Sequence, residues 1–480
     1  MNDKSVMSNF FWRFAERCGA QGVSFIVSII LARLIAPEEY GVIALVTVFT
    51  SILQVFVDSG FGTALIQKKD ADEIDFSSVF YFNIIFCLIL YVLLFFASPY
   101  IALFYGKPQL SGVTRVLGLR IIISSFKNVQ QAYVSKNMIF KKFFWATLGG
   151  TIAAGVIGIV FAYFGLGVWA LVIQGLVNST MDTIILWFTV KWRPKKCFSI
   201  ARLRGLLSFG SKMLISSLIG TIYNDLRQLI IGKMYSASDL AYYNKGKQLP
   251  NLAITNINTS IDSVLLPAMS KKQDDPKQVK AMTRRAMSVS IYIMAPIFMG
   301  LAFCAEPIIK LLLTEKWMMC VPFLRIFCIT YMFHPVHTAN LNAIKAMGRS
   351  DLFLKLEIIK KIMGIALLVS SMWFGVMAMA YSLLVSSVLS QIINSWPNRK
   401  LLNYSYIDQL KDILPSILLA VFMGVCVSFV ALIGLSDILT IVIQVILGAF
   451  VYIAGSLIFK LETFTYLWEK VKSFLIRHKA

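Results

Sequence analysis

The chain has 480 residues, of which 58% are hydrophobic and 15% are charged, and its mean hydropathy is +0.74. This composition excludes a water-soluble globular protein, because apolar runs long enough to cross a bilayer recur along the whole sequence. The formal net charge of +22 could suggest nucleic-acid binding. That charge is spread over short loops instead of one basic face, so we exclude nucleic acid as a partner.

The apolar runs are too continuous for barrel strands, which alternate, and they predict an all-α polytopic membrane protein. Charged residues, glycines and prolines divide the sequence into about 14 transmembrane helices. Their expected limits, in chain order, are 11–35, 40–66, 76–104, 110–135, 143–164, 166–190, 205–233, 239–269, 286–313, 317–345, 353–374, 376–397, 412–433 and 437–459. The least apolar of these spans are 11–35, 110–135, 205–233, 239–269 and 317–345.

Lysine and arginine are distributed very unequally between the loops that join these spans. Alternate loops, together with the tail 460–480, hold 30 of these residues, whereas the loops on the other side hold five. The positive-inside rule therefore places the first set, with both termini, in the cytoplasm. Within the tail, Leu461, Phe464 and Trp468 are spaced as on one helix face among cations. This pattern predicts an amphipathic helix on the inner leaflet, with membrane lipids as partners.

Two short motifs recur about 200 residues apart. "EEYG" (38–41) and "SDLA" (238–241) open the second and the eighth span, and "KKDAD" (68–72) and "KKQDD" (271–275) follow the same two spans. Six spans with the same orientation therefore form a repeat, which is a feature of transporters. The expected domains are an N-terminal lobe 1–204, a C-terminal lobe 205–397, a helix pair 398–459 and the amphipathic tail 460–480.

Polar side chains run along one face of several spans. In span 239–269 they recur at steps of three and four residues, and Pro250 removes one backbone hydrogen bond. Single polar groups often bridge helices or reach the membrane surface, and that interpretation stays open here. Because an ionisable group in the bilayer costs roughly 2.5–3.5 kcal/mol, we expect the polar faces to converge on a central hydrophilic cavity.

The candidate cavity residues fall into three chemical groups. Cations suited to a phosphate or pyrophosphate headgroup are Arg13, Arg17, Arg120, Lys127, Lys212 and Arg227. Amides suited to sugar hydroxyls are Asn178, Asn224, Gln228, Asn244, Gln248, Asn251 and Asn258. Carboxylates suited to a coupling H⁺ or Na⁺ are Glu16, Asp58, Asp182, Asp225 and Asp262.

Other chemistry has little support in the sequence. The seven cysteines are scattered and form no CxxC motif, so neither a disulfide framework nor a zinc site is expected. His334 and His337 are helical neighbours, but Pro335 lies between them and no third ligand is evident, so we expect no metal. The N-terminus lacks the order of regions found in a signal peptide, and we expect no cleavage.

Six segments carry a resemblance to a known family, and they are "LARLIAPEEYGVIAL" (31–45), "DSGFGTALIQKKD" (58–70), "FGLGVWALVIQ" (164–174), "YYNKGKQLPNLAITNINTSIDSVLLPAMSKKQDDP" (242–276), "EPIIKLLLTEKW" (306–317) and "AMGRSDLFLKLEIIKK" (346–361). In these segments the sequence is similar to the polysaccharide-transporter branch of the multidrug/oligosaccharidyl-lipid/polysaccharide superfamily, and within it to Wzx-type exporters of colanic acid, teichuronic acid and lipopolysaccharide units. The sequence departs from the family pattern in "YYNKGKQ" and "LTEKW", without changing the class.

The resemblance implies a flippase in the bacterial cytoplasmic membrane, with two six-helix lobes around a central cavity and a C-terminal helix pair. Its substrate would be an undecaprenyl-pyrophosphate-linked oligosaccharide, moved by alternating access with ion coupling and delivered to polymerase and export machinery. The resemblance implies no catalytic residues and no cofactor. A multidrug antiporter of the same superfamily is one alternative, although it favours an acid-dominated cavity. A membrane glycan polymerase or ligase is a weaker one, because it normally needs a large external loop.

Overall fold

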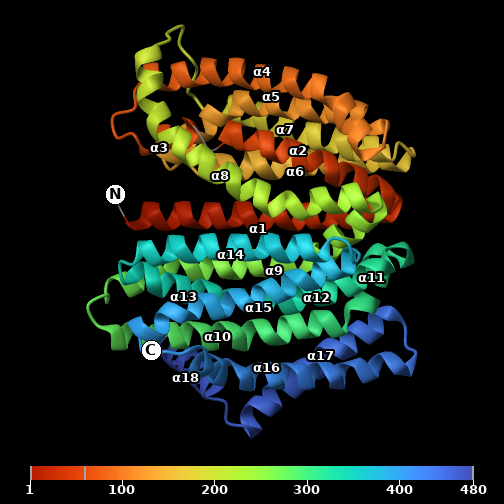
Figure 1. Ribbon diagram of the computed structural model, residues 1–480, viewed down its shortest axis with the longest axis vertical. Coiled ribbons are helices and arrows are strands. Elements are labelled where there is room, and N and C mark those ends of the chain that lie inside the picture. The colour runs from red at the N-terminus through yellow and green to blue at the C-terminus, as the bar shows by residue number, and fades with distance from the viewer. Residues whose placement is uncertain (1–2, 59–60, 478–480) are drawn as a thin grey trace. The chain divides into compact units, whose positions relative to one another are not determined.

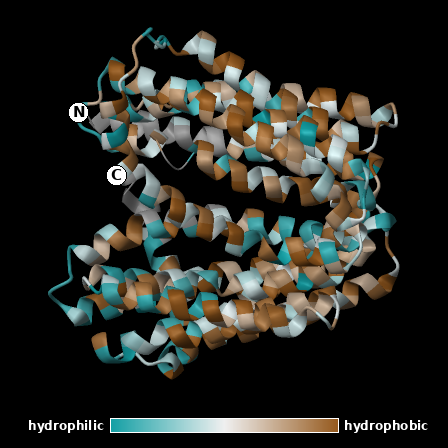
Figure 2. Ribbon diagram, turned by 45° about the horizontal axis from the view of Figure 1, so that its top comes forward, coloured by the Kyte–Doolittle hydropathy of each residue, from teal (hydrophilic) through white to brown (hydrophobic). Residues whose placement is uncertain are grey.

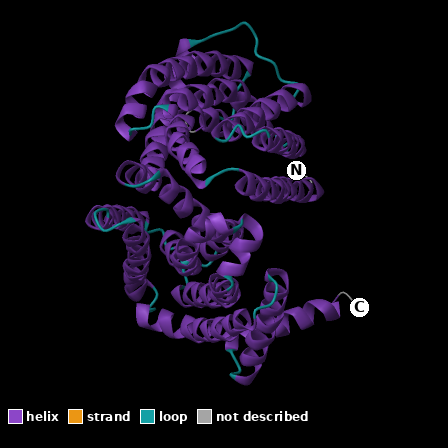
Figure 3. Cartoon of the chain, turned by 90° about the vertical axis from the view of Figure 1, so that its right-hand side faces the viewer, coloured by secondary structure: helices purple, strands orange, loops and turns teal. Residues whose placement is uncertain are grey.

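The computed structural model describes residues 3–58 and 61–477, and every regular element in these ranges is a helix (Figure 3). In the first half the helices are α1 (Asp3–Leu34), α2 (Pro37–Asp58), α3 (Phe61–Gln67), α4 (Glu73–Tyr105), α5 (Gln109–Lys136), α6 (Lys141–Tyr163), α7 (Val168–Thr189) and α8 (Ile200–Met234). The next are α9 (Ala237–Ser270), α10 (Pro276–Phe303), α11 (Ala305–Leu313), η1 (Glu315–Cys320), α12 (Val321–Met332) and α13 (His334–Ala346). The last are α14 (Ser350–Ser371), α15 (Val376–Leu401), α16 (Tyr406–Ser428), η2 (Phe429–Ile433), α17 (Asp437–Ile458) and α18 (Glu462–Arg477).

The prediction of an all-α polytopic membrane protein is confirmed. Within the described ranges nine helices are long and apolar enough to cross a membrane, or ten if the bent helix α8 counts as one span. Figure 2 shows hydrophobic residues along most of the helix lengths. On α4 the exposed side chains include Ile85, Ile89 and Phe96, which share one face and match a surface that contacts lipid.

Each predicted span coincides with one helix or with consecutive helices, but apolarity alone does not establish the number 14. Among the helices that coincide with predicted spans, α1, α5, α9 and α14 do not meet the criteria of length and composition, and in α1 the described apolar part, Cys18–Leu34, is too short to meet them. The sequence identifies the first three as weakly apolar. It does not single out α14, in which Lys355, Glu357, Lys360 and Lys361 follow one another within two turns.

The chain divides into two compact units, Met1–Ala241 and Tyr242–Ala480. Helix α8 belongs to the first unit, where it packs against α2, α3 and α4. The predicted lobe boundaries at 204 and 397 come from the internal repeat. The division into compact units does not test them, so they stay predictions. In the second unit α10 is central, because it packs against α12, α13, α16 and α17.

In the first unit α5 holds the other helices together. It packs against α2, α3, α4 and α7, and Figure 1 shows α2, α4 and α5 running alongside one another. An aromatic cluster fixes one end of this group. Phe76 of α4 packs against Tyr133 and Trp192, and Phe80 packs against Trp192, with ring centroids 5.8–6.1 Å apart. Such buried aromatic pairs stabilise helix packing beyond the area that they bury. This packing sets the positions of the polar faces of α2 and α5.

The two copies of the repeated lysine motif end in the same structural position. Asp72, which ends "KKDAD", caps the N-terminus of α4, and Asp275, which ends "KKQDD", caps the N-terminus of α10. The Asp72 carboxylate accepts a hydrogen bond from the amide of Asp75, and that of Asp275 accepts one from the amide of Gln278. These amide hydrogen bonds lower the pKa of both carboxyl groups. The same capping role of the two aspartates supports the predicted repeat of spans with the same orientation.

Gly246 allows α9 and α12 to approach closely in the second unit. A Cβ atom at this position would lie 2.6 Å from Cβ of Phe323 and 2.9 Å from the carbonyl oxygen of Cys320. We therefore expect Gly246→Ala to lower the stability by about 1–3 kcal/mol, because the two backbones must separate. At Gly205 of α8 a Cβ atom meets nothing within 4 Å. Gly205→Ala should therefore be neutral or stabilising by up to about 1 kcal/mol.

Thermal unfolding midpoints of both variants in detergent micelles check this prediction. An unchanged or higher midpoint for Gly246→Ala would contradict the close packing of α9 and α12.

Candidate functional site

Two polar helix faces meet in the first unit. On α2 the face consists of Thr47, Ser51, Gln54 and Asp58, at steps of four, three and four residues. On α5 it consists of Arg120, Ser124, Lys127 and Gln131, with the same steps. Such steps place all members on one side of a helix. Because α2 and α5 pack directly against each other, the two faces line a common space.

This space contains two hollows, of about 270 and 280 Å³, that share Gln54, Asp58 and Arg120 in their walls. The first extends to Thr221 of α8, and the second extends to α3 and to Ser135 of α5. We call the two hollows together the α2–α5 cavity. Polar groups from four helices therefore surround one space inside the first unit, which can hold water or polar ligand groups.

Asp58 is held by amide groups within this cavity. Its carboxylate accepts hydrogen bonds from Nε2 of Gln54 at 3.0 and 3.1 Å and from Nδ2 of Asn128 at 3.4 Å. No cation forms an ion pair with Asp58 among the residues that the structure describes. Asp58 is therefore a carboxylate that neutral donors orient and that an H⁺ or a Na⁺ can approach.

Lys127 and Asp182 form an ion pair that connects α5 with α7. Their Nζ and Oδ2 atoms are 2.5 Å apart, and the two side chains are only 15% and 11% exposed. A pair so close and so poorly solvated is a strong charge-assisted contact, and neither charge can be removed alone without a large cost. Lys127 still lines the α2–α5 cavity, so it also contributes positive potential there.

Arg120 is the cation of this cavity with an uncommitted head group. It is exposed, it lines both hollows, and it forms no hydrogen bond or ion pair within 4 Å of another described residue. The guanidinium has five donors in a planar fork that matches phosphate oxygens. Arg120 can therefore bind an anion without first breaking a contact of its own.

Asp225 of α8 is tied to the same polar face of α2. Its Oδ2 accepts a hydrogen bond of 2.8 Å from Ser51, and its Oδ1 accepts one of 2.9 Å from Gln228. Two predicted site residues of α8, Asp225 and Gln228, thus lie beside the α2–α5 cavity. Lys212 and Asn224 on the same helix are exposed, and Arg227 is buried.

The polar stripe of α9 meets α13 in the second unit. Oδ1 of Asn258 accepts a hydrogen bond of 2.7 Å from Thr338, and Oδ1 of Asp262 accepts one of 2.8 Å from Asn342. Part of the stripe therefore bridges two helices, as the sequence analysis left open. Asn251 is exposed, whereas Asn244 and Gln248 are partly buried.

The remaining predicted site residues lie elsewhere. Asn178 of α7 is partly buried. The side chains of Arg13, Glu16 and Arg17 lie outside those that the structure describes. His337 contacts Ser387 and Asn394 at 3.3 and 3.2 Å, and the described residues contain no group of three side chains that could hold a metal ion.

The sequence analysis missed several polar residues of the α2–α5 cavity, and four of them form or touch the polar face of α2. They are Thr47, Ser51, Gln54 and Asn128. The spacing of Thr47, Ser51, Gln54 and Asp58 is the same as that of the stripes found on other spans, so it could have revealed the α2 face. Asn128 has no such signal, because it lies beside the α5 stripe and is identified only by its contact with Asp58.

A helical membrane protein with a polar cavity among its spans has the features of a transporter, and comparison with solved structures identifies the fold. The chain is similar to the lipid II flippase MurJ in an inward closed conformation, with a TM-score of 0.73, 15% identity and coverage of 95% of this chain and 99% of that one. It is also similar to an inward-facing multidrug resistance MATE family transporter of the MOP superfamily, with a TM-score of 0.64, 16% identity and coverage of 82% and 98%. The chain therefore shares its fold with these two proteins.

The sequence itself specifies the branch. A family model described as "Polysaccharide biosynthesis protein" matches residues 30–322, and the chain belongs to this family. It is 23% identical to the teichuronic acid biosynthesis protein TuaB of Bacillus subtilis, over 89% of both chains. It is 24% identical to the lipopolysaccharide biosynthesis protein WzxC of Escherichia coli, over 78% of this chain and 76% of that one. The resemblance to this family that was found in the sequence is confirmed.

Proposed function

We propose that this protein is a flippase that moves an undecaprenyl-pyrophosphate-linked oligosaccharide across the bacterial cytoplasmic membrane. The family supports a role in polysaccharide synthesis. Its relatives include the succinoglycan biosynthesis transport protein ExoT of Rhizobium meliloti, 25% identical over 69% of this chain and 67% of that one. In this proposal both termini are cytoplasmic, and polymerase and export machinery receive the flipped unit.

The observation that carries the proposal is the charge arrangement of the α2–α5 cavity. An arginine inside a membrane protein is costly unless an anion or water solvates it. Arg120 has no ion-pair partner among the described residues, and Lys127 adds positive potential although Asp182 pairs with it. A pyrophosphate group has the charge and the oxygen geometry that suit this site.

The sugar and the ion would use other parts of the protein. We assign sugar contacts to the amide-rich stripe of α9, with the exposed Asn251 as the first candidate. We assign ion coupling to Asp58, because only neutral amides hold its carboxylate among the described residues. The proposal includes alternating access, in which the substrate site opens to each side of the membrane in turn.

Deletion of the gene tests this function. We expect the deletion strain to accumulate the lipid-linked repeat unit on the cytoplasmic leaflet and to lose the corresponding surface polysaccharide, while a plasmid copy restores both. Extraction and quantification of the lipid-linked unit measure the first effect, and staining of the surface polysaccharide measures the second. Normal export in a strain without a related transporter would refute the proposal.

A multidrug antiporter shares this fold, so the fold does not separate the two functions. The uncommitted Arg120 argues against a cationic drug as the substrate, because like charges repel in a site of low dielectric. Unchanged drug sensitivity on overexpression is the outcome that we expect.

A further inference from the structure

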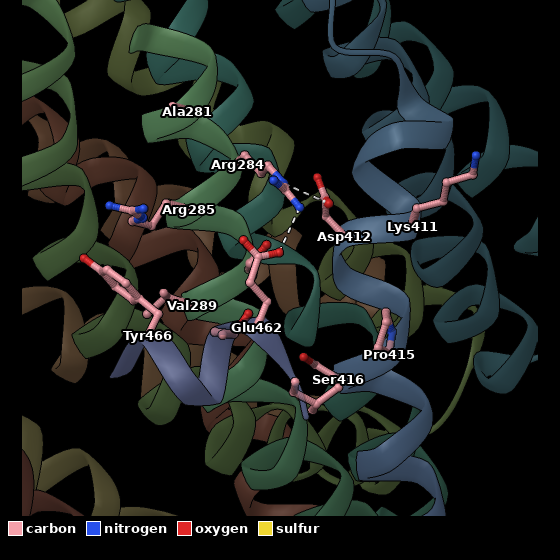
Figure 4. Close-up of a pocket in the computed structure, with 13 residues that line it drawn as sticks. Ala281, Arg284, Arg285, Val289, Lys411, Asp412, Pro415, Ser416, Glu462 and Tyr466 are labelled. Atoms are coloured by element: carbon pink, nitrogen blue, oxygen red, sulfur yellow. Dashed lines mark hydrogen bonds and ion pairs between the residues drawn. The ribbon is translucent and has the colours of Figure 1, made fainter. Parts of the chain in front are cut away.

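A separate pocket lies in the second unit where α10, α16 and α18 meet (Figure 4). Its volume is about 300 Å³. Its charged walls are formed by Arg284, Arg285, Lys411, Asp412 and Glu462, and Val289, Pro415 and Leu461 contribute apolar surface. We call it the α18 pocket. None of its residues belongs to the candidate transport site.

Arg284 lies at the centre of the α18 pocket, where its guanidinium binds two carboxylates. Its Nε lies 2.9 Å from Oδ1 of Asp412, and its NH2 nitrogen lies 3.1 Å from Oε2 of Glu462. The hydroxyl of Tyr404 donates a 2.7 Å hydrogen bond to the other carboxylate oxygen of Asp412. These contacts raise the pKa of the Arg284 guanidinium, chiefly through the hydrogen bond to Asp412. Arg284 therefore clamps the first turn of α18 to α10 and α16.

Two other cations of the pocket form no salt bridge with a described residue. Arg285 lies over the ring of Tyr466, with Cζ 4.3 Å from the ring centroid, and Lys411 is exposed at the start of α16. Figure 4 shows the two on opposite sides of the Arg284 clamp. Arg284 and its two carboxylates carry one net negative charge, so with Arg285 and Lys411 the charged walls of the pocket sum to one positive charge. An anion is the ligand that this charge selects.

The pocket lies at the boundary between the charged N-terminal parts of α10 and α16 and the apolar parts that follow them. No charged residue occurs between Arg285 and the end of α10, or between Asp412 and the end of α16. The α18 helix that closes the pocket is amphipathic and carries Trp468, which is 62% exposed. Tryptophan and cations at such a level are typical of the headgroup region of a bilayer.

We propose that the α18 pocket binds the headgroup of an anionic phospholipid, which the positive potential of Arg285 and Lys411 on the two sides of the Arg284 clamp attracts. The apolar surface of Val289, Pro415 and Leu461 suits the glycerol and upper acyl region, which a free phosphate does not have. A bound lipid would therefore bridge α10, α16 and α18. This site is independent of the proposed transport function, because it needs neither the lipid-linked substrate nor an ion gradient.

Native mass spectrometry of the purified full chain in detergent tests the site, with phosphatidylglycerol as the probe. We expect one tightly retained phosphatidylglycerol on the wild type. Retention should weaken roughly thirty-fold in Arg285→Gln/Lys411→Gln, the product of about fivefold for each lost cation near a membrane surface. The matched control Lys271→Gln/Lys277→Gln removes the same charge from two exposed positions, one in the loop before α10 and one in its first turn, and should retain the lipid.

Three results would overturn the proposal. One is equal retention by the wild type and the double variant, and another is equal retention of zwitterionic phosphatidylcholine by the wild type. The third is displacement of phosphatidylglycerol by millimolar inorganic phosphate, which would make the pocket a site for soluble anions. If the double variant does not fold, Lys411→Gln alone, at an exposed position, should still show the fivefold loss.

Discussion

Replacement of Arg120 by glutamine is expected to reduce polysaccharide export by about two orders of magnitude, while the protein reaches the membrane at its normal level. The expected loss of export follows from the charge pair that Arg120 would form with the pyrophosphate of the proposed substrate. Removal of one partner of such a pair, away from water, costs about 2–5 kcal/mol. Arg120 forms no ion pair within 4 Å with a described residue, so its removal leaves no protein carboxylate without a partner. The structural cost should therefore be small, and the loss should appear in transport.

Two variants sharpen this test. Arg120→Lys keeps the charge but loses the planar fork, and it should restore part of the export. Arg115→Gln is the matched control on the same helix, because Arg115 already donates a 2.9 Å hydrogen bond to Ser98 and lies 4.2 Å from the ring centroid of Phe95. It should lower thermal stability, and export should fall only in proportion to the protein level.

Export is measured as surface polysaccharide per molecule of transporter, together with the amount of lipid-linked unit that accumulates. Full export by Arg120→Gln would remove Arg120 from the proposed substrate site.

The sequence was sufficient for the positions of the helices, because the length of an apolar run between charged breaks depends on local composition. It was not sufficient for the number of spans. Helices such as α5 and α14 carry several charges, and only their packing partners decide whether such helices can enter a membrane. In the same way, the apolar face of α18 was predictable, whereas its attachment through Glu462 to Arg284 was not.

The candidate site also combines features that the sequence could predict with features that only the packing of the helices determines. Helical spacing predicted that Arg120 and Lys127 share a face, and both line the α2–α5 cavity. Spacing within one helix contains no information about the partner, so the pairing of Lys127 with Asp182 required the packing of α5 on α7. Asn258 and Asp262 recur at a step of four, and so do their partners Thr338 and Asn342. The matching steps on the two helices could have suggested that α9 contacts α13 through these side chains. They could not have shown whether the side chains meet each other or line a cavity.

The ion pair of Lys127 with Asp182 should respond very differently to single and to double replacement. Lys127→Met leaves the carboxylate of Asp182, whose side chain is 11% exposed, without its cation. We expect this variant to lose about 3–5 kcal/mol of stability and to be nearly absent from the membrane. In Lys127→Met/Asp182→Leu no charge is left unpaired, and the protein should return to a near-normal level because apolar replacements of a buried pair are often neutral.

A matched control is the pair of Arg325 with Glu306, at 2.8 Å in the second unit. Its side chains are 45% and 58% exposed, so Arg325→Met should cost at most about 1 kcal/mol. Protein levels by immunoblot and unfolding midpoints in detergent measure these effects. Comparable losses of stability in Lys127→Met and Arg325→Met would contradict the prediction. They would show that burial of the Lys127–Asp182 pair does not determine how much stability is lost when its lysine is removed.

Export by the double variant separates the structural role of Lys127 from its role toward the substrate. If the pair served only to hold α5 against α7, the folded double variant would export normally. Lys127 also faces the α2–α5 cavity beside Arg120, and its positive potential there is absent from the double variant. We therefore expect the folded double variant to export less than about a tenth of the wild-type amount, since even one charge-assisted hydrogen bond contributes about 1.5–3 kcal/mol. Normal export at a normal protein level would confine Lys127 to a structural role and leave Arg120 as the cation for the pyrophosphate.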